Sequence, residues 1–141
     1  MALTKHPLTE ALLSLVYPRG CGACGKTLLP NQDWLCTRCF FELSEPTESS
    51  QAELLKERLS LHFSVSQAQH LFTFHEQGRV QHLIHRLKYH GQKQIGLKAG
   101  QLLGQKILDS GWTLPDLIVP VPLHPKRLAK RGFNQSDLLA K

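Results

Sequence analysis

All four cysteines of this 141-residue sequence fall within nineteen positions, as two C-x-x-C pairs. Cys21 pairs with Cys24, and after an eleven-residue spacer Cys36 pairs with Cys39. Each C-x-x-C turn can place two sulfurs on one side of a metal ion, so two turns complete the tetrahedron of thiolates that zinc prefers. We therefore expect one structural zinc ion held by all four cysteines. Because four thiolates leave no open coordination position, its role would be in folding and not in catalysis.

Two other uses of the cysteines explain the sequence less well. Disulfides need an oxidising compartment, yet the longest apolar candidate near the start, residues 8–16, is interrupted by Glu10 and precedes no small-residue cleavage site. A redox C-x-x-C would explain one pair but not two. No apolar run approaches the roughly 20 residues that a membrane span requires. We expect a cytoplasmic chain without membrane insertion.

Charge is distributed unevenly along the chain. The composition is 41% hydrophobic and 20% charged, which is typical of a soluble globular protein. Residues 61–141 contain eleven Lys and Arg against four Asp and Glu, a net charge of +7, whereas residues 1–60 have a net charge of −1. The second part favours an anionic partner such as nucleic acid, a nucleotide or a phosphorylated sugar. A solvated basic surface is the alternative interpretation.

Hydrophobic periodicity predicts an α/β fold. Helical spacing of apolar residues is found in several segments, and two further segments have the pattern of strands, the second of them uniformly apolar as in a strand buried on both faces. The predicted helices are 4–17, 51–61, 79–89, 95–108 and one starting near Gln135, and the predicted strands are 68–75 and 117–119. The polar stretch 44–50 suggests a boundary. We expect a helix and zinc ribbon over 1–45, a connector with a short helix over 46–66, and an α/β domain over 67–141.

Several histidines and phenylalanines invite functional interpretations. His82 and His85 are three apart on one predicted helix, but no carboxylate cluster accompanies them, so we expect surface or packing roles and not metal binding. Phe63, Phe72 and Phe74 are expected in the core and not as a platform for stacking bases.

A basic segment follows the predicted strand 117–119. Loops at the carboxyl ends of strands in an open α/β sheet are where ligands bind, and a cluster of cations there suits a phosphate or pyrophosphate group. Amide side chains next to the cations could donate hydrogen bonds and cap the following helix. The candidate phosphate-binding residues are Lys126, Arg127, Lys130, Arg131, Gly132, Asn134 and Gln135. The alternative is a solvated basic loop.

Four ordered segments resemble a known family. Residues 131–136, Arg-Gly-Phe-Asn-Gln-Ser, and residues 119–124, Val-Pro-Val-Pro-Leu-His, resemble the signature of the ComF family. Residues 83–91 resemble its LKY-type segment, and residues 18–39 are similar to its amino-terminal zinc ribbon. ComF proteins are bacterial phosphoribosyltransferase-like proteins associated with competence, and in some relatives with the use of DNA as a nutrient.

The resemblance implies a zinc ribbon followed by the first part of a type I phosphoribosyltransferase-like open parallel sheet. It places the basic segment over the pyrophosphate of magnesium-bound phosphoribosyl pyrophosphate. One departure is important: the family's later D-D-x-x-T-T-G segment, which holds the ribose phosphate, is absent, and none of the four Asp residues adjoins another. We therefore expect a truncated or partial chain that is not catalytically competent alone, with magnesium bound only in an intact relative. No catalytic residue is assigned.

A non-catalytic adaptor for DNA uptake is the alternative function. It would use the zinc ribbon and the basic second part to bind single-stranded DNA or proteins of DNA uptake. An incomplete parallel sheet would also leave an exposed edge, which favours association with another chain.

Overall fold

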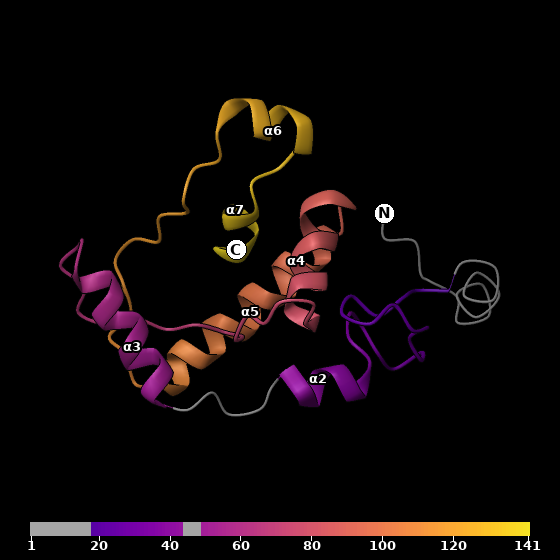
Figure 1. Ribbon diagram of the computed structural model, residues 1–141, viewed down its shortest axis with the longest axis horizontal. Coiled ribbons are helices and arrows are strands. Elements are labelled where there is room, and N and C mark those ends of the chain that lie inside the picture. The colour runs from indigo at the N-terminus through magenta and orange to yellow at the C-terminus, as the bar shows by residue number, and fades with distance from the viewer. Residues whose placement is uncertain (1–17, 44–48) are drawn as a thin grey trace, which may run out of the picture.

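The computed structural model describes residues 18–43 and 49–141, and the regular structure of this part of the chain is helical (Figure 1). The helices are α2 Thr37–Leu43, α3 Ser49–Ser60, α4 Arg79–Tyr89, α5 Lys93–Asp109, α6 Pro125–Arg131 and α7 Gln135–Leu139. The predicted helix over 4–17 and the predicted boundary at residue 45 lie outside the described residues. The division into three domains thus stays a prediction.

The predicted α/β fold is wrong for the described residues, which contain no strand and no parallel sheet. Their β-type pairing is limited to an isolated antiparallel bridge between Gly20 and Thr27. Both predicted strands, 68–75 and 117–119, are irregular. Leu117 and Val119 are 75% and 73% exposed, so within the described residues the apolar run is not buried on both faces as expected.

The physical reason is that a strand needs a neighbour for its backbone groups. Within the described residues, no backbone N–H or C=O of residues 117–119 is paired with another backbone group. An apolar run with high strand propensity cannot form a sheet by itself, because even an isolated two-stranded hairpin is only marginally stable. The exposed sheet edge that we expected to mediate association therefore has no counterpart in this part of the structure.

The four predicted helices that fall within the described residues are confirmed. The bounds of α4 coincide with the prediction, and its inward positions Leu83 and Leu87 are 3% and 8% exposed. Helix α3 begins two residues before the segment predicted over 51–61 and ends one residue before its end, α5 begins two residues before its prediction, and α7 begins at the predicted Gln135. Helices α2 and α6 were not predicted.

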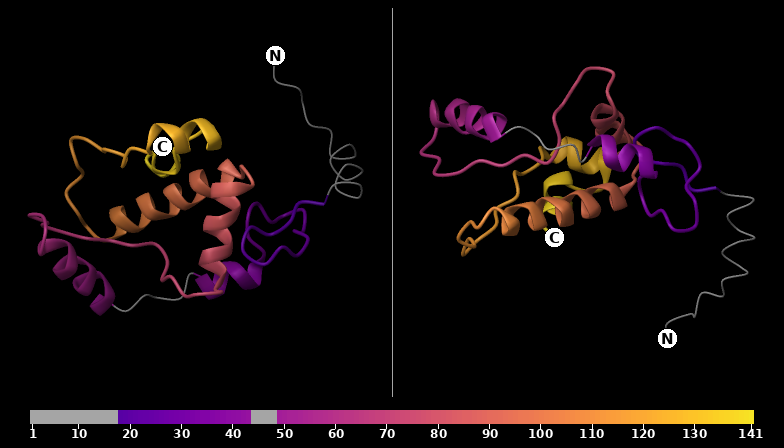
Figure 2. Two further views of the ribbon diagram at one scale, coloured as in Figure 1. Left: turned by 45° about the horizontal axis from the view of Figure 1, so that its top comes forward. Right: turned by 90° about the horizontal axis from the view of Figure 1, so that it is seen from below.

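The segment around the cysteines, residues 18–43, packs on α4 and α5 through one continuous core. We call residues 18–43 the metal ribbon. Figure 2 shows α4 between the metal ribbon and α5, with α3 at the opposite end of the molecule. The buried apolar residues of this core are Cys21, Ala23, Leu28, Leu35, Cys39, Leu83, Leu87, Ile95, Phe133 and Leu138. The metal ribbon, α4, α5 and the segment from Phe133 to α7 therefore share one core.

Two glycines allow the backbone to pack closely against neighbouring elements in this core. A Cβ atom at Gly22 would lie 3.0 Å from Leu83 Cδ2 and 3.1 Å from Ile95 Cδ1, so the backbone of the metal ribbon lies directly on α4 and α5. A Cβ atom at Gly100 in α5 would lie 2.5 Å from the carbonyl oxygen of Leu139 in α7. The absence of a side chain at these positions lets the elements pack closely.

The region between α3 and α4 is more open. Phe63 and Phe74 are 67% and 54% exposed, so their predicted place in the core is wrong, whereas Phe72 does pack against the core.

The imidazole of His70 is withdrawn from solvent, and Lys106 Nζ donates a hydrogen bond to the His70 carbonyl at 3.1 Å. Burial first, and the nearby Lys106 charge second, lower the pKa of His70. Neutral imidazole is therefore favoured in the folded state.

Across residues 18–43 and 49–141, no helix combines the length and the apolar character needed to cross a bilayer.

Candidate metal centre and basic pocket

The four cysteines converge as the sequence predicted. Their Sγ atoms all lie within 4.8 Å of one another, and Cys24 Sγ lies 3.8 Å from Cys36 Sγ. A regular tetrahedron of thiolates at the usual zinc–sulfur bond length has edges of about 3.8 Å. The four cysteines therefore fit a single tetrahedral metal ion.

Local hydrogen bonds shape the two knuckles that carry the sulfurs. In the first, the Cys21 N–H donates to the Lys26 carbonyl at 2.7 Å and the Gly25 N–H donates to the Cys21 carbonyl at 2.9 Å. Gly25 has a φ of +79°, the left-handed conformation that favours glycine. In the second, the Phe40 N–H donates to the Cys36 carbonyl at 2.9 Å, and Cys39 lies in the first turn of α2. Each pair is thus held by its own backbone.

Backbone donors favour the thiolate form of Cys21 but not that of Cys39. Burial raises the pKa of Cys21, but N–H groups of Cys24, Cys36 and Ala23 outweigh it and lower that pKa to about 6. Burial and the neighbouring sulfurs raise the pKa of Cys39. Four thiolates this close repel one another, so a cation between them is needed before all can ionise together.

Arg79, the first residue of α4, connects the metal centre to the helices. Its Nη1 donates to Cys39 Sγ at 3.0 Å and also forms an ion pair with Glu42 of α2. A second ion pair joins Asp33 of the ribbon to Lys98 of α5 at 2.7 Å. Hydrogen bonds to metal-bound groups from outside the ligand set orient the ligands. Arg79 was not among the functional residues predicted from the sequence.

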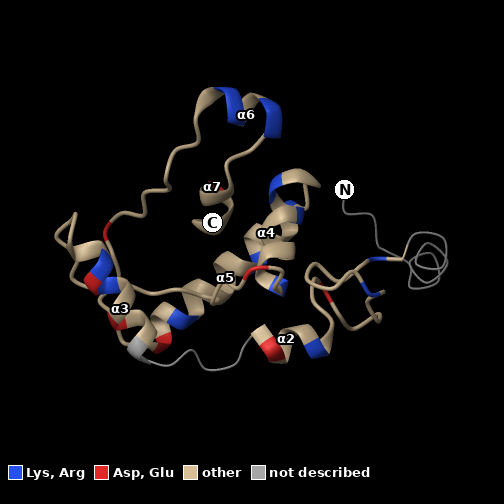
Figure 3. Ribbon diagram, in the orientation of Figure 1, with Lys and Arg blue, Asp and Glu red and all other residues tan. Residues whose placement is uncertain are grey.

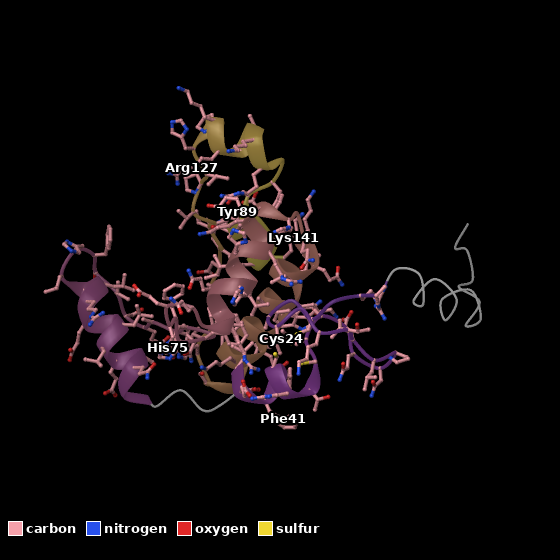
Figure 4. The ribbon with its side chains drawn as sticks, turned by 45° about the vertical axis from the view of Figure 1, so that its right-hand side comes forward. Cys24, Phe41, His75, Tyr89, Arg127 and Lys141 are labelled. Atoms are coloured by element: carbon pink, nitrogen blue, oxygen red, sulfur yellow. The ribbon has the colours of Figure 1, made fainter. Side chains whose placement is uncertain are left out.

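A second feature is a pocket of about 680 Å³ between the C-terminal end of α4 and the segment containing α6. We call it the basic pocket. It is lined by Lys88, Tyr89, Gly91, Leu123, Arg127, Lys130, Arg131, Phe133 and Gln135. Figure 3 shows the Lys and Arg of α6 at the same end of the molecule as the C-terminal end of α4, and in Figure 4 Arg127 and Tyr89 lie at that end, away from Cys24.

Part of the predicted phosphate-binding segment is a short helix and not a loop. The His124 side chain accepts a hydrogen bond from the Lys126 N–H at 3.3 Å and caps α6, and Pro125 occupies its first turn. Gly132 ends α6 in the left-handed conformation, with a φ of +76°. Helical spacing brings Arg127, Lys130 and Arg131 to the basic pocket, whereas Lys126 is not among its lining residues.

The two predicted amide donors have different positions. Asn134 is 9% exposed and structural: its Nδ2 donates to the Val121 carbonyl at 3.0 Å and to Asp137 Oδ1 at 2.8 Å, while its Oδ1 caps α7. Gln135 lines the basic pocket, and within the described residues its buried Nε2 has no hydrogen-bond partner. Gln135 is therefore the predicted amide that lies at the basic pocket with its donor unpaired among the described residues.

Lys88 and Tyr89 also line the basic pocket, although neither was predicted to bind phosphate. Tyr89 is 66% exposed, and the Arg131 guanidinium carbon lies 5.8 Å from its ring centroid. The sequence feature that could have identified them is a cation next to an aromatic residue at the end of an amphipathic helix. His82 and His85 are exposed on α4, as expected, and the ring of His85 lies 4.8 Å from that of Tyr89.

These features define a helical metal-ribbon protein with a basic pocket. The chain is 46% identical over 61 residues to the DNA utilization protein YhgH of Salmonella typhi and, equally, to that of Escherichia coli K12, which covers 40% of this chain and 27% of each relative. It is 40% identical over 62 residues to Competence protein F of Haemophilus influenzae, covering 41% and 27%. The chain thus spans about a quarter of the length of these relatives.

These relatives support the assignment of the chain to the ComF family and confirm the resemblance seen in its motifs. No family model and no solved structure matches the sequence.

Proposed function

We propose that this chain provides a single-stranded DNA-binding unit of a ComF-like protein that takes part in DNA utilisation. The observation that carries the proposal is the basic pocket, where four cations, Lys88, Arg127, Lys130 and Arg131, surround a space that Tyr89 also lines. Names of the relatives, DNA utilization protein and Competence protein F, agree with such a ligand.

The residues of the basic pocket suit a single strand for two reasons. Cations bind backbone phosphates without regard to sequence, and exposed aromatic rings stack on unpaired bases. Tyr89 offers an exposed ring, and Gln135 a buried donor without a partner among the described residues. The basic pocket can thus neutralise phosphates and contact a base at the same time.

We also propose that the ion of the metal centre is zinc. Four thiolates at tetrahedral spacing are the usual donors of structural zinc sites. Bound zinc supplies the cross-link between the two knuckles. The four cysteines hold it, Arg79 orients Cys39, and the assembled ribbon supports the start of α5 through Gly22.

The pyrophosphate group of phosphoribosyl pyrophosphate is a second candidate ligand for the same pocket. The observation that favours it is the placement of four cations around one space, together with the Gln135 amide, which has no partner among the described residues; this matches the chemistry of a compact polyphosphate. The sequence has no adjacent acidic pair that would hold the accompanying magnesium. We therefore propose that the basic pocket binds this anion, and we propose no transfer reaction.

The test is fluorescence anisotropy with a labelled oligothymidylate about fifteen nucleotides long, within the range of single-strand sites. The variant Arg127→Gln/Lys130→Gln, which we call the α6 double variant, removes two pocket cations. Since both are exposed, we expect about a twofold to fivefold loss of affinity for each and a salt slope shallower by about 1.4 in total. Lys56→Gln/Arg58→Gln on α3 removes the same charge away from the pocket and should leave both quantities near wild type.

Competition with inorganic pyrophosphate separates the two candidate ligands. If the α6 double variant weakens binding of the oligonucleotide and pyrophosphate displaces it, both anions share the basic pocket. If the variant weakens pyrophosphate binding alone, the second candidate is correct. If both double variants behave alike toward both ligands, the basic pocket is only a solvated surface and the proposed function is wrong.

A further inference from the structure

A second pocket, of about 590 Å³, lies between the metal ribbon and the start of α5. We call it the ribbon pocket. It is lined by Pro18, Arg19, Gly20, Gly22, Leu28, Asp33, Trp34, Gly91, Gln92, Lys93, Gln94 and Ile95. Neither the cysteine motif nor the basic segment pointed to it, because its residues come from two parts of the chain about sixty positions apart.

The ribbon pocket repeats the chemistry of the basic pocket. Arg19 and Lys93 are exposed cations, and Trp34 is a half-buried aromatic residue whose carbonyl is fixed by the Gly22 N–H at 2.8 Å. The acidic residue in the lining, Asp33, is neutralised by its ion pair with Lys98 at 2.7 Å. Cations next to an aromatic surface again suit a phosphate with its attached base.

The two pockets adjoin each other at the turn between α4 and α5. Gly91 lines both, and among the described residues nothing lies within 4 Å of the position that its Cβ would take. Lys93 lines the ribbon pocket, and its Nζ lies 5.3 Å from the ring centroid of Phe133, which lines the basic pocket. The two pockets therefore meet at Gly91, with the Lys93 cation beside the junction.

We propose that the ribbon pocket is a second subsite for the same DNA strand: nucleotides next to those in the basic pocket cross Gly91, with a phosphate at Arg19 and Lys93 and a base against Trp34. The metal ribbon is then part of the binding surface as well as a structural module. This inference rests on the proposed function, since it assumes that a strand occupies the basic pocket.

The test compares oligothymidylates of two lengths, because a trinucleotide can fill one pocket and a strand of about fifteen nucleotides can fill both. Arg19→Gln should weaken the long strand about twofold to fivefold, as expected for an exposed cation, and make its salt slope shallower by about 0.7. Binding of the trinucleotide should not change. Arg58→Gln on α3 is the matched control, and Lys93→Gln should act like Arg19→Gln.

Intrinsic fluorescence gives an independent measurement without altering the ribbon pocket. Trp34 and Trp112 are the two tryptophans of the sequence, so Trp112→Phe leaves Trp34 as the sole reporter. Stacking of a base on Trp34 should quench its emission when the long strand binds and should leave it unchanged with the trinucleotide.

The outcomes separate this inference from the proposed function. If the α6 double variant weakens the long strand but Arg19→Gln does not, and Trp34 emission stays unchanged, the second subsite is refuted while the basic pocket stands. If the α6 double variant has no effect on either length, the proposed function itself is refuted. Loss of trinucleotide binding in Arg19→Gln would also contradict the inference, because the two pockets would then not be separate subsites.

Discussion

Two glycines one helical turn apart in α5 should respond in opposite ways to alanine. Gly100 faces α7, where a Cβ atom would lie 2.5 Å from the Leu139 carbonyl oxygen and 3.0 Å from its carbonyl carbon. These are backbone atoms, which cannot rotate away, so α7 must shift. At Gly104, no described atom lies within 4 Å of the corresponding position.

The magnitudes follow from two opposing effects. Alanine stabilises a helix interior by about 0.5–1 kcal/mol relative to glycine, whereas overpacking a close contact costs about 1–3 kcal/mol. Gly104→Ala should therefore stabilise the protein by about 0.5–1 kcal/mol. Gly100→Ala should destabilise it by about 1–2 kcal/mol, because the clash with backbone outweighs the gain in helix propensity.

Thermal unfolding of the zinc-loaded protein, followed by circular dichroism at the helical band, measures the difference. A gap of about 2 kcal/mol between the variants corresponds to roughly 8 °C in Tm for a chain of this size. If Gly100→Ala melts at or above the wild-type temperature, α7 does not pack on α5 as described, and the reasoning from close approach is wrong.

Four further predictions concern single side chains. Cys36→Ser should abolish stoichiometric zinc, measured by elemental analysis, and unfold the ribbon, whereas equal zinc content would contradict a four-thiolate site. Arg79→Met should speed zinc removal by a chelator severalfold with the ligands intact; Arg38→Met on α2 is the control. Asn134→Ala should cost about 1–2 kcal/mol in urea unfolding, since it removes a helix cap and leaves the Val121 carbonyl without its donor. Because the pKa of His70 is lowered on folding, the unfolded chain binds more protons near the ordinary histidine pKa, so stability should fall as pH drops through about 6.5, and His70→Gln should flatten that dependence.

Local sequence signals predicted the metal centre and most of the helices. Two C-x-x-C pairs form compact knuckles whose hydrogen bonds are largely their own, so spacing alone brings the four sulfurs together. The bounds of α4 followed from its apolar stripe and from Gly91, which has a φ of +64° directly after the C-cap. Such features depend on a few adjacent residues.

The errors involve features that depend on distant partners. The apolar run 117–119 predicted a buried strand, yet Ile118 is 61% exposed, because strand formation requires a neighbouring strand that periodicity cannot reveal. Helix α6 was not predicted because most of its residues are charged and show no apolar stripe. The residues that indicate it are those at its two ends, the N-cap His124 and the C-cap Gly132. The ribbon pocket could not be predicted, since only tertiary packing brings Trp34 next to Lys93.

The central claim is that a single DNA strand lies across the basic pocket, and photo-cross-linking locates the strand directly. An oligonucleotide carrying 5-bromodeoxyuridine would be irradiated with the zinc-loaded protein, and the modified residue identified by mass spectrometry. The account predicts cross-links at Tyr89 of the basic pocket and at Trp34 of the ribbon pocket. Phe41 and Phe63 are equally exposed aromatic residues, each 67% accessible, outside both pockets. Cross-links at these two residues, with none at Tyr89, would contradict the account.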